Sequence, residues 1–200
     1  MIYLTNRSVT GWIFVAATLT IMVIFQFLDV RDLRYQSDWW VDAEYWRGLT
    51  SHWVHANWPH LLLNAAGLTL CLTLASPKWS MRRWIVYNLF LASGISALFT
   101  LRNPELNWYV GYSGILFGIY LLAAVDLYSR DKIIALILGA AIVIKVVLEQ
   151  TSDIRITSGD LIGVPVIIDA HLYGLLLGLS IALVQRAYTI WIRGDNSSAI

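Results

Sequence analysis

The chain has 200 residues and a formal net charge of +1, with 58% hydrophobic and only 14% charged residues. A soluble domain carries about 25% charged residues, so this composition argues against an ordinary soluble protein. The balanced charge also argues against a nucleic-acid partner. The length suits one domain, which we expect to occupy residues 1–200.

The apolar residues are gathered into six long runs. A helix that crosses a bilayer needs about 20 mostly apolar residues. We therefore predict an all-α membrane protein, a bundle of six transmembrane helices in direct contact with lipid. The runs lie near residues 11–28, 59–75, 84–101, 112–128, 133–148 and 164–185.

The basic and tryptophan residues orient these runs. All ten tryptophans lie at run ends or in connections, where indole rings prefer the headgroup region. With a cytoplasmic N-terminus, the inside segments hold eight Lys and Arg residues and the outside loops hold five. Cytoplasmic segments are enriched in these residues, so we expect both termini in the cytoplasm. The long connection near 29–58 is predicted to contain short helices in the outer interface.

Polar residues in or beside these runs are candidates for function, because polar groups are costly inside a membrane. Ser113 in GYSG and His60 in HLLLN open two runs that are entered from outside. His171 in AHLYG lies six residues past Pro165, about 9 Å along a helix. All three residues are therefore predicted at similar depth in the outer half of the membrane.

Two glycine pairs predict where the fourth and sixth helices meet. Gly114 begins GILFG and Gly174 begins GLLLG, and such small-xxx-small surfaces let helix backbones approach closely. Ser113 directly precedes the first surface, and His171 lies one turn before the second. Packing at these surfaces would bring the Ser113 hydroxyl to an imidazole nitrogen, which can take its proton and activate it as a nucleophile.

Three groups are candidate donors to an oxyanion. The Ser113 backbone N–H lies in the first turn of a predicted helix, where it has no intrahelical partner. His60 and Asn64 are four residues apart, so their side chains project from one helix face. Such donors stabilise the negative oxygen of a tetrahedral intermediate.

Three stretches together resemble the signatures of the rhomboid intramembrane proteases: YWRGLTSHWVHANWPHLLLN, GYSGILFG and AHLYGLLLG. The first follows the family pattern W-R-x-x-T-x-x-x-x-H-x-x-x-x-H-x-x-x-N from Trp46 to Asn64. The resemblance implies a serine endopeptidase with a Ser113–His171 dyad, no third acid and no cofactor. It also implies that His60 and Asn64 serve the oxyanion.

The same resemblance implies supporting roles around this pair. It places Phe117 one turn after the serine, where the family has an aromatic ring that stacks on the histidine. It gives Gly111, Gly114 and Gly174 positions beside the site. It assigns three residues to an ordered first loop rather than to chemistry: Trp46, Arg47 and His55.

The stretches WPHLLLNAAGL and AHLYG resemble the rhombosortases of Gram-negative bacteria. That resemblance implies a bacterial inner-membrane enzyme whose active site opens to the periplasm. Its substrates would be secreted proteins held by a C-terminal anchor that contains Gly-Gly. A general rhomboid protease that cleaves other transmembrane proteins is the alternative.

Other readings of the polar residues stay open beside this one. A single serine or histidine in a membrane helix is more often helix–helix glue than a catalyst, and His60 and Asn64 could simply cap and pack their helix. A rhomboid-like protein that binds clients without cutting them would keep the scaffold. A transporter would need ionisable residues through the whole membrane thickness, which this sequence lacks.

Four further polar residues have expected roles outside the chemistry. Glu149 reads as a solvated residue of an outer loop, and Lys145 is expected to extend toward a membrane surface. Asp169 lies two residues from His171 and should face another way. His52 matches no position of the rhomboid pattern and is expected in the interface. The spacing of His52, His55 and His60 fits no metal-binding pattern, so no metal site is expected.

Overall fold

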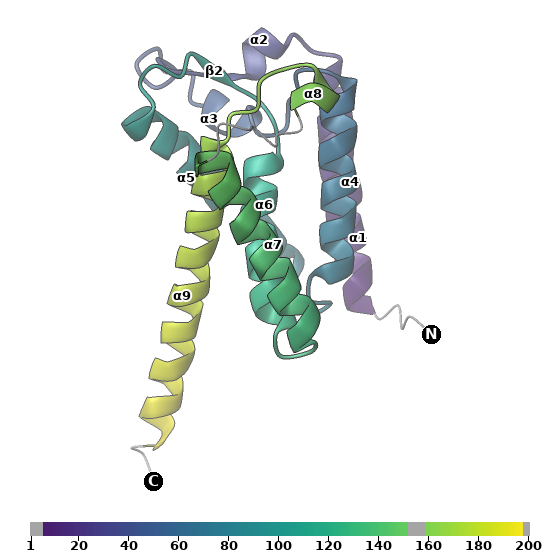
Figure 1. The fold of residues 1–200 in the computed structure, drawn as a ribbon, viewed down its shortest axis with the longest axis vertical. Coiled ribbons are helices and arrows are strands. Elements are labelled where there is room, and N and C mark those ends of the chain that lie inside the picture. Colours follow the sequence, from purple (N-terminus) through teal and green to yellow (C-terminus); the bar gives the residue numbers. More distant parts are fainter. Residues whose placement is uncertain (1–5, 152–158, 198–200) are drawn as a thin grey trace.

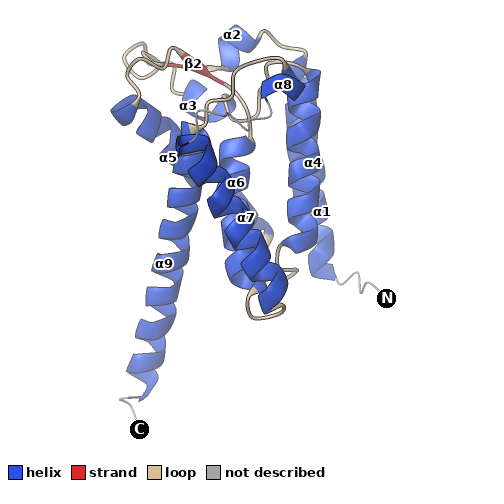
Figure 2. Cartoon of the chain, in the orientation of Figure 1, coloured by secondary structure: helices blue, strands red, loops and turns tan. Residues whose placement is uncertain are grey.

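The computed structural model describes residues 6–151 and 159–197, which are mainly helical and contain very little strand (Figures 1 and 2). Six helices are long: α1 (Asn6–Gln26), α4 (Trp58–Leu74), α5 (Met81–Arg102), α6 (Ser113–Leu127), α7 (Lys132–Thr151) and α9 (Asp169–Ser197). Three more have four residues each: α2 (Val30–Leu33), α3 (Arg47–Thr50) and α8 (Gly159–Ile162). The strands β1 (Tyr35–Gln36) and β2 (Trp108–Tyr109) form one short antiparallel pair.

The long helices coincide with the six apolar runs, with differences at their ends. The sixth run was expected from residue 164, but α9 begins at Asp169 and continues to Ser197. Pro165 explains the late start, because a proline disfavours helical backbone at the residue before it. Gly163, at φ +69°, turns the chain just ahead of this segment. The first run was expected to reach residue 28, but α1 ends at Gln26.

Four of the described helices are long and apolar enough to cross a membrane by themselves: α1, α5, α7 and α9. The other two long helices are apolar but shorter, with 17 residues in α4 and 15 in α6. At 1.5 Å per residue, α6 is about 22 Å long, less than the roughly 30 Å of a bilayer core. One end of α6 must therefore lie below a membrane surface if the helix stands upright.

The short helix α6 is the centre of the bundle. It contacts α4, α5, α7 and α9, and buried residues occur all around its circumference. A helix that is apolar on every side belongs inside a protein or membrane rather than at a boundary. The helix α6 begins lower than the upper end of α4, beneath the loops at this end of the molecule (Figure 1).

The contact between α6 and α9 is made by backbone rather than by side chains. A methyl group on Gly174 would lie 1.9 Å from the Gly114 carbonyl oxygen, and one on Gly178 would lie 2.8 Å from the Gly118 carbonyl oxygen. Every one of these four positions therefore needs glycine. The two glycine surfaces expected from the sequence meet each other, as in other closely packed membrane helices.

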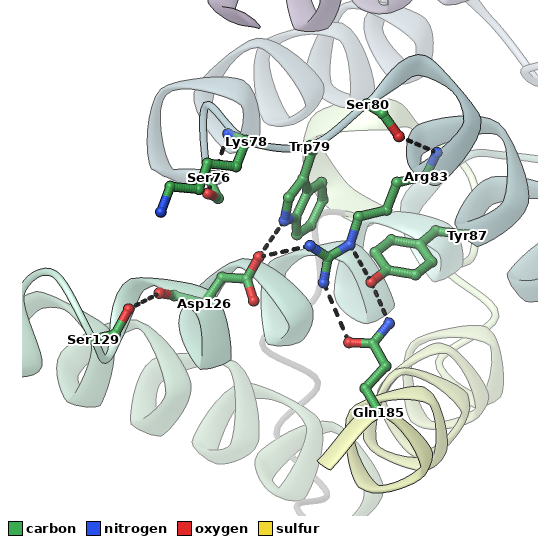
Figure 3. Close-up of polar contacts among 9 residues, drawn as sticks. All are labelled: Ser76, Lys78, Trp79, Ser80, Arg83, Tyr87, Asp126, Ser129 and Gln185. Carbon is green, nitrogen blue, oxygen red and sulfur yellow. Dashed lines mark hydrogen bonds and ion pairs between the residues drawn. The ribbon is translucent and has the colours of Figure 1, made fainter. Parts of the chain in front are cut away.

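A polar cluster joins α5, α6 and α9 at the opposite end of the bundle (Figure 3). The Arg83 guanidinium lies 3.4 Å from the Asp126 carboxylate, and it donates to Gln185 Oε1 at 3.2 Å and to the Tyr87 hydroxyl. Trp79 donates its indole N–H to Asp126 and lies beneath the guanidinium, 5.2 Å from ring centroid to Cζ. Arg83, near the start of α5, therefore fastens three helices to one another.

Trp79 and Trp84 differ from the expectation that tryptophans meet the headgroups. Both rings are only 1% exposed, and they pack edge to face with their centroids 4.7 Å apart. Trp12, at 45% exposure, and Trp191, at 66%, do face outward. Trp79 lies in the turn before α5 and Trp84 lies in the first turn of α5, so the two buried rings close this end of the bundle against α1.

The connection between α1 and α4 is an ordered cap rather than a free loop. The Arg47 side chain is buried and donates to the carbonyl oxygens of Arg31 at 2.6 Å and Arg34 at 3.2 Å. It also forms an ion pair with Glu44. These bonds satisfy backbone groups of α2 and its flanks, which have no ladder partner of their own.

His52 lies inside this cap, so the prediction of an interfacial side chain was wrong. Its ring is fully buried, and Nε2 lies 3.0 Å from the Ser96 hydroxyl of α5. The Ser96 hydroxyl donates in turn to the Gly48 carbonyl oxygen at 2.8 Å. Burial lowers the pKa of His52 to about 3, so the ring is neutral at physiological pH.

The glycine contact predicts a position-specific effect on stability. Gly174→Ala places a methyl group against the Gly114 carbonyl, and such overpacking costs about 1–3 kcal/mol. At about 2–4 °C per kcal/mol, we expect the thermal unfolding midpoint in detergent to fall by roughly 5 °C.

Gly139→Ala is the matched control, because nothing lies within 4 Å of a methyl group at that position of α7. Its midpoint should stay the same or rise slightly, since alanine favours helix over glycine. Equal midpoints for the two variants would show that α6 and α9 do not touch at Gly174.

Candidate active site

Ser113 and His171 lie together at the N-terminal end of the central helix α6. Ser113 is the first residue of α6, and His171 is in the first turn of α9. The Ser113 hydroxyl oxygen lies 2.9 Å from His171 Nε2, which is hydrogen-bonding distance. The two residues come from the two helices that meet through their glycines, so the backbone contact sets this distance.

Phe117 holds the histidine ring from the side. Its ring stacks on His171 with centroids 4.3 Å apart and planes 15° apart. Phe117 lies one helical turn after Ser113, so the two residues are on the same face of α6. Ser113 presents its hydroxyl to His171, and Phe117 packs against the imidazole ring. Only the sequence resemblance had indicated this contact.

Glu149 contacts the other nitrogen of the histidine, contrary to the prediction of a solvated loop residue. Its carboxylate Oε2 lies 2.8 Å from His171 Nδ1, and the Glu149 side chain is 1% exposed. The apolar run was expected to end at residue 148, but α7 continues to Thr151 and turns Glu149 inward. The spacing of Lys145 and Glu149, one helical turn apart, was the available sequence signal.

Lys145 and Asp169 take definite positions around this contact. Lys145 Nζ lies 2.7 Å from Glu149 Oε1, and its side chain is 37% exposed. Asp169 faces away from His171: it accepts from Asn103 Nδ2 at 2.7 Å and from Gln150 Nε2 at 3.4 Å. Asp169 therefore ties α9 to the C-terminal ends of α5 and α7.

His60 and Asn64 approach the serine from α4. Both are buried and line a cavity that Ser113 also lines. One Asn64 amide hydrogen donates to the His60 carbonyl oxygen at 3.2 Å, which leaves the second hydrogen for another acceptor. The first turn of α4 is fixed by Asn57, whose side chain accepts from the His60 backbone N–H at 2.9 Å.

Gly111 fits the loop before Ser113 against the His60 ring. Its φ of +122° is a backbone conformation that side chains rarely adopt, and a methyl group there would lie 2.7 Å from His60 Cε1 and Nε2. The Gly111 backbone N–H donates to the Ser51 carbonyl oxygen at 2.9 Å. The first glycine of GYSG is therefore required both for its conformation and for its lack of a side chain.

Tyr109 was missed in the sequence, whereas His55 was expected in the ordered first loop and lies there beside the site. Tyr109 is buried in β2 and donates its hydroxyl to the Gly111 carbonyl oxygen at 2.6 Å. Burial raises the pKa of Tyr109, against the opposing effect of the Gly114 backbone and the Ser113 hydroxyl, so the phenol stays protonated. His55 packs edge-on against His60 at 5.0 Å, and burial lowers its pKa to about 3.

The cavity beside Ser113 has a volume of about 310 Å³. Its walls come from α4, from the strand segment 105–110 and from the non-helical segment 164–167, with Ile162 at one edge. The walls are mainly apolar, with His60, Asn64, Glu105 and Asn107 as the polar exceptions.

A comparison with family models matches a rhomboid domain to residues 42–188. A comparison with curated proteins finds no match. The matched region includes the second half of the ordered cap from residue 42, the helices from α4 onward as far as residue 188 of α9, and every candidate site residue. It confirms the resemblance of the sequence motifs to the rhomboid family. The chain therefore belongs to the rhomboid family of intramembrane serine proteases, and it is an integral membrane protein.

Proposed function

We propose that this protein is an active intramembrane endopeptidase in which Ser113 is the nucleophile and His171 the general base. The observation that carries the proposal is the 2.9 Å contact between the Ser113 hydroxyl and His171 Nε2. A serine hydroxyl is a weak nucleophile until an adjacent base takes its proton, and this contact supplies that base. The family match makes peptide-bond hydrolysis the reaction to expect.

The chemistry follows from these positions. As Ser113 Oγ bonds to the scissile carbonyl carbon, its proton passes to His171 Nε2 and the carbonyl oxygen becomes an oxyanion. Collapse of this intermediate breaks the C–N bond, and His171 returns the proton to the leaving amine. Water then attacks the acyl-enzyme through the same base and releases the serine.

The oxyanion would meet three donors. The Ser113 backbone N–H is free of the helix ladder, the second Asn64 amide hydrogen is unused, and the His60 ring lines the same cavity. Donors fixed in advance act most strongly in a site of low dielectric, because they need no reorganisation during the reaction.

We place all six long helices across the membrane, with both termini in the cytoplasm and the site toward the periplasm. The short α6 supports this arrangement, because its first residue then lies below the outer surface. Irregular backbone is tolerated at membrane depth where it is covered by protein or lines a water-filled cavity. The segments around the 310 Å³ cavity meet that condition.

Among substrates, we propose the Gly-Gly-containing C-terminal anchors processed by rhombosortases. The mainly apolar cavity would accept an extended segment with small side chains, and a glycine pair unwinds a helix more easily than other residues do. A general rhomboid specificity for other transmembrane proteins is the alternative. A client-binding protein without activity would have no need for the hydroxyl–imidazole contact.

Ser113→Ala should abolish cleavage without unfolding the protein. Alanine removes the attacking oxygen but keeps the helix start, so expression and helix content should match wild type. Comparative mass spectrometry of membrane and secreted proteins, from cells with each variant, would detect new C-termini only with wild type. Ser129→Ala, in an exposed turn at the other end of α6, is the matched control and should cleave normally. Continued cleavage by Ser113→Ala would end the assignment.

Asn64→Ala should slow the reaction by roughly a hundredfold, the effect of losing one oxyanion donor. Activity should not vanish, because the Ser113 backbone donor remains. The rate of Ser113 labelling by a fluorophosphonate reports this loss, since the probe places an oxygen where the oxyanion forms. An unchanged rate, at an unchanged unfolding midpoint, would make Asn64 a packing residue.

The substrate proposal predicts dependence on glycine in the anchor. A reporter would carry a Gly-Gly pair, one apolar span and a C-terminal basic cluster, which keeps the glycine pair at the outer boundary. Replacing Gly-Gly by Leu-Leu should block processing while the anchor still inserts, because leucine favours helix by about 1 kcal/mol per residue. Equal cleavage of both reporters would favour the general rhomboid specificity.

A further inference from the structure

A third helix contributes a charged pair to the site that the serine–histidine mechanism does not use. Ser113 Oγ lies 2.9 Å from His171 Nε2, and Glu149 Oε2 lies 2.8 Å from His171 Nδ1. The second oxygen of Glu149 lies 2.7 Å from Lys145 Nζ. The four side chains form one continuous row of contacts that begins on α6, passes through α9 and ends on α7.

We propose that Glu149 is a positioning residue for catalysis, the acid of a Ser113–His171–Glu149 triad, and that Lys145 holds its carboxylate in place. This inference rests on the proposed function, because it assigns Glu149 a role that acts through His171. It departs from the family resemblance, which implies a dyad without an acid.

The first argument is the tautomer of the histidine. A neutral imidazole carries one proton, and only the nitrogen without that proton can act as a base. A carboxylate at 2.8 Å from Nδ1 accepts a hydrogen bond there and so keeps the proton on Nδ1. Nε2 is then left with its lone pair facing the Ser113 hydroxyl, as the reaction requires.

The second argument is the charge that forms during the reaction. When His171 takes the serine proton it becomes an imidazolium in a buried place, where an unpaired charge is costly. Glu149 presents a negative charge in direct contact with this ring. In soluble proteases the triad acid stabilises the imidazolium in the same way without itself becoming protonated.

The third argument is that the surroundings leave this role to Glu149. From α6, His171 meets the Ser113 hydroxyl and the Phe117 ring, neither of which is charged. From α4, the neighbouring titratable group is the His60 ring, and from α7 it is Glu149 with Lys145 behind it. On α9 itself, Asp169 is bonded to Asn103 and Gln150 instead.

A purely structural role explains less of this geometry. A buried ion pair of Lys145 and Glu149 alone would satisfy both charges, and replacing such pairs by apolar residues is often neutral or stabilising. The carboxylate here divides its two oxygens between the lysine and the base of the site. This division is the arrangement that orients a catalytic histidine.

One test needs no substitution in the triad. Nitrogen-15 NMR of histidine-labelled, full-length protein in detergent distinguishes the two neutral tautomers, and the His171 signals are those lost in His171→Asn. We expect the neutral His171 ring to carry its proton on Nδ1, with the strongly deshielded Nδ1–H of a bond to a carboxylate. A proton on Nε2 in the resting protein would overturn the proposal.

The second test is Glu149→Gln, which keeps the shape but removes the charge. We expect the fluorophosphonate labelling rate of Ser113 to fall by at least about tenfold; soluble proteases lose about 10⁴-fold without their acid. The acidic limb of the pH–rate profile should also move to lower pH, because the imidazolium has lost its anionic partner. Glu149→Asp should keep the wild-type limb even if its rate is lower.

Asp126→Asn is the matched control, because it removes another ion-paired carboxylate, at the far end of the bundle. It should lower the unfolding midpoint and leave the pH profile in place. A Glu149→Gln variant with the wild-type rate, or with a slower rate and an unmoved acidic limb, would reduce Glu149 to a structural residue. If this variant does not fold, the tautomer measurement on the wild-type chain decides alone.

The two proposals fail in different ways. Cleavage or labelling that persists in Ser113→Ala removes the proposed nucleophile, whatever Glu149 does. Labelling that depends on Ser113 but not on Glu149 leaves the protease intact and removes only the acid from the triad.

Discussion

The close approach of α6 and α9 is the constraint on which the site depends. Gly114 and Gly174 meet backbone to backbone, with no side chain between them, so the separation of the two helices is fixed by covalent geometry rather than by adjustable packing. Ser113 directly precedes Gly114, and His171 lies one turn before Gly174. A hydrogen bond of 2.9 Å between their side chains therefore follows from a contact that contains neither residue. The polar cluster around Arg83 holds the same two helices to α5 at their other ends and so fixes their crossing (Figure 3).

The start of α6 is recessed, so the backbone groups of the loop before it need hydrogen-bond partners, because unsatisfied groups are costly at membrane depth. This is a second requirement of the site. The ordered cap meets it from above. Ser51 accepts the Gly111 N–H, the Tyr109 hydroxyl donates to the Gly111 carbonyl, and β1 pairs with β2 just before this point. The same groups that stabilise the loop leave the Ser113 N–H and the cavity to a substrate. The hydrogen bonds that stabilise the cap therefore also keep the site accessible.

The apolar runs predicted most ends of the long helices to within a few residues, because helices depend on local pattern; α9 is the exception, since it extends to Ser197 rather than to residue 185. The two glycine surfaces predicted that α6 and α9 touch, and with them that Ser113 and His171 lie together. The sequence did not predict Glu149, because one extra turn of α7 decides whether residue 149 is a loop residue or faces His171. The sequence also did not predict that His52 and Tyr109 are buried. Their burial depends on how the cap folds, and the cap has no periodic sequence pattern. Contacts between distant elements could be predicted only where a motif such as the glycine pairs marks them on both partners.

The charge balance of the site explains why Lys145 lies beside Glu149. Before proton transfer, Lys145 and Glu149 cancel, so the buried site carries no net charge. Afterwards the imidazolium and the oxyanion add one positive and one negative charge, and the total is again zero. Without Lys145, the resting carboxylate would be a lone charge in a region of low dielectric, where it would tend to take up a proton and lose its effect on His171. Lys145, one helical turn away, balances the charge of this acid through its contact with Glu149 Oε1. The pair thus allows a charged acid to act below a membrane surface, where a carboxylate alone would be neutralised.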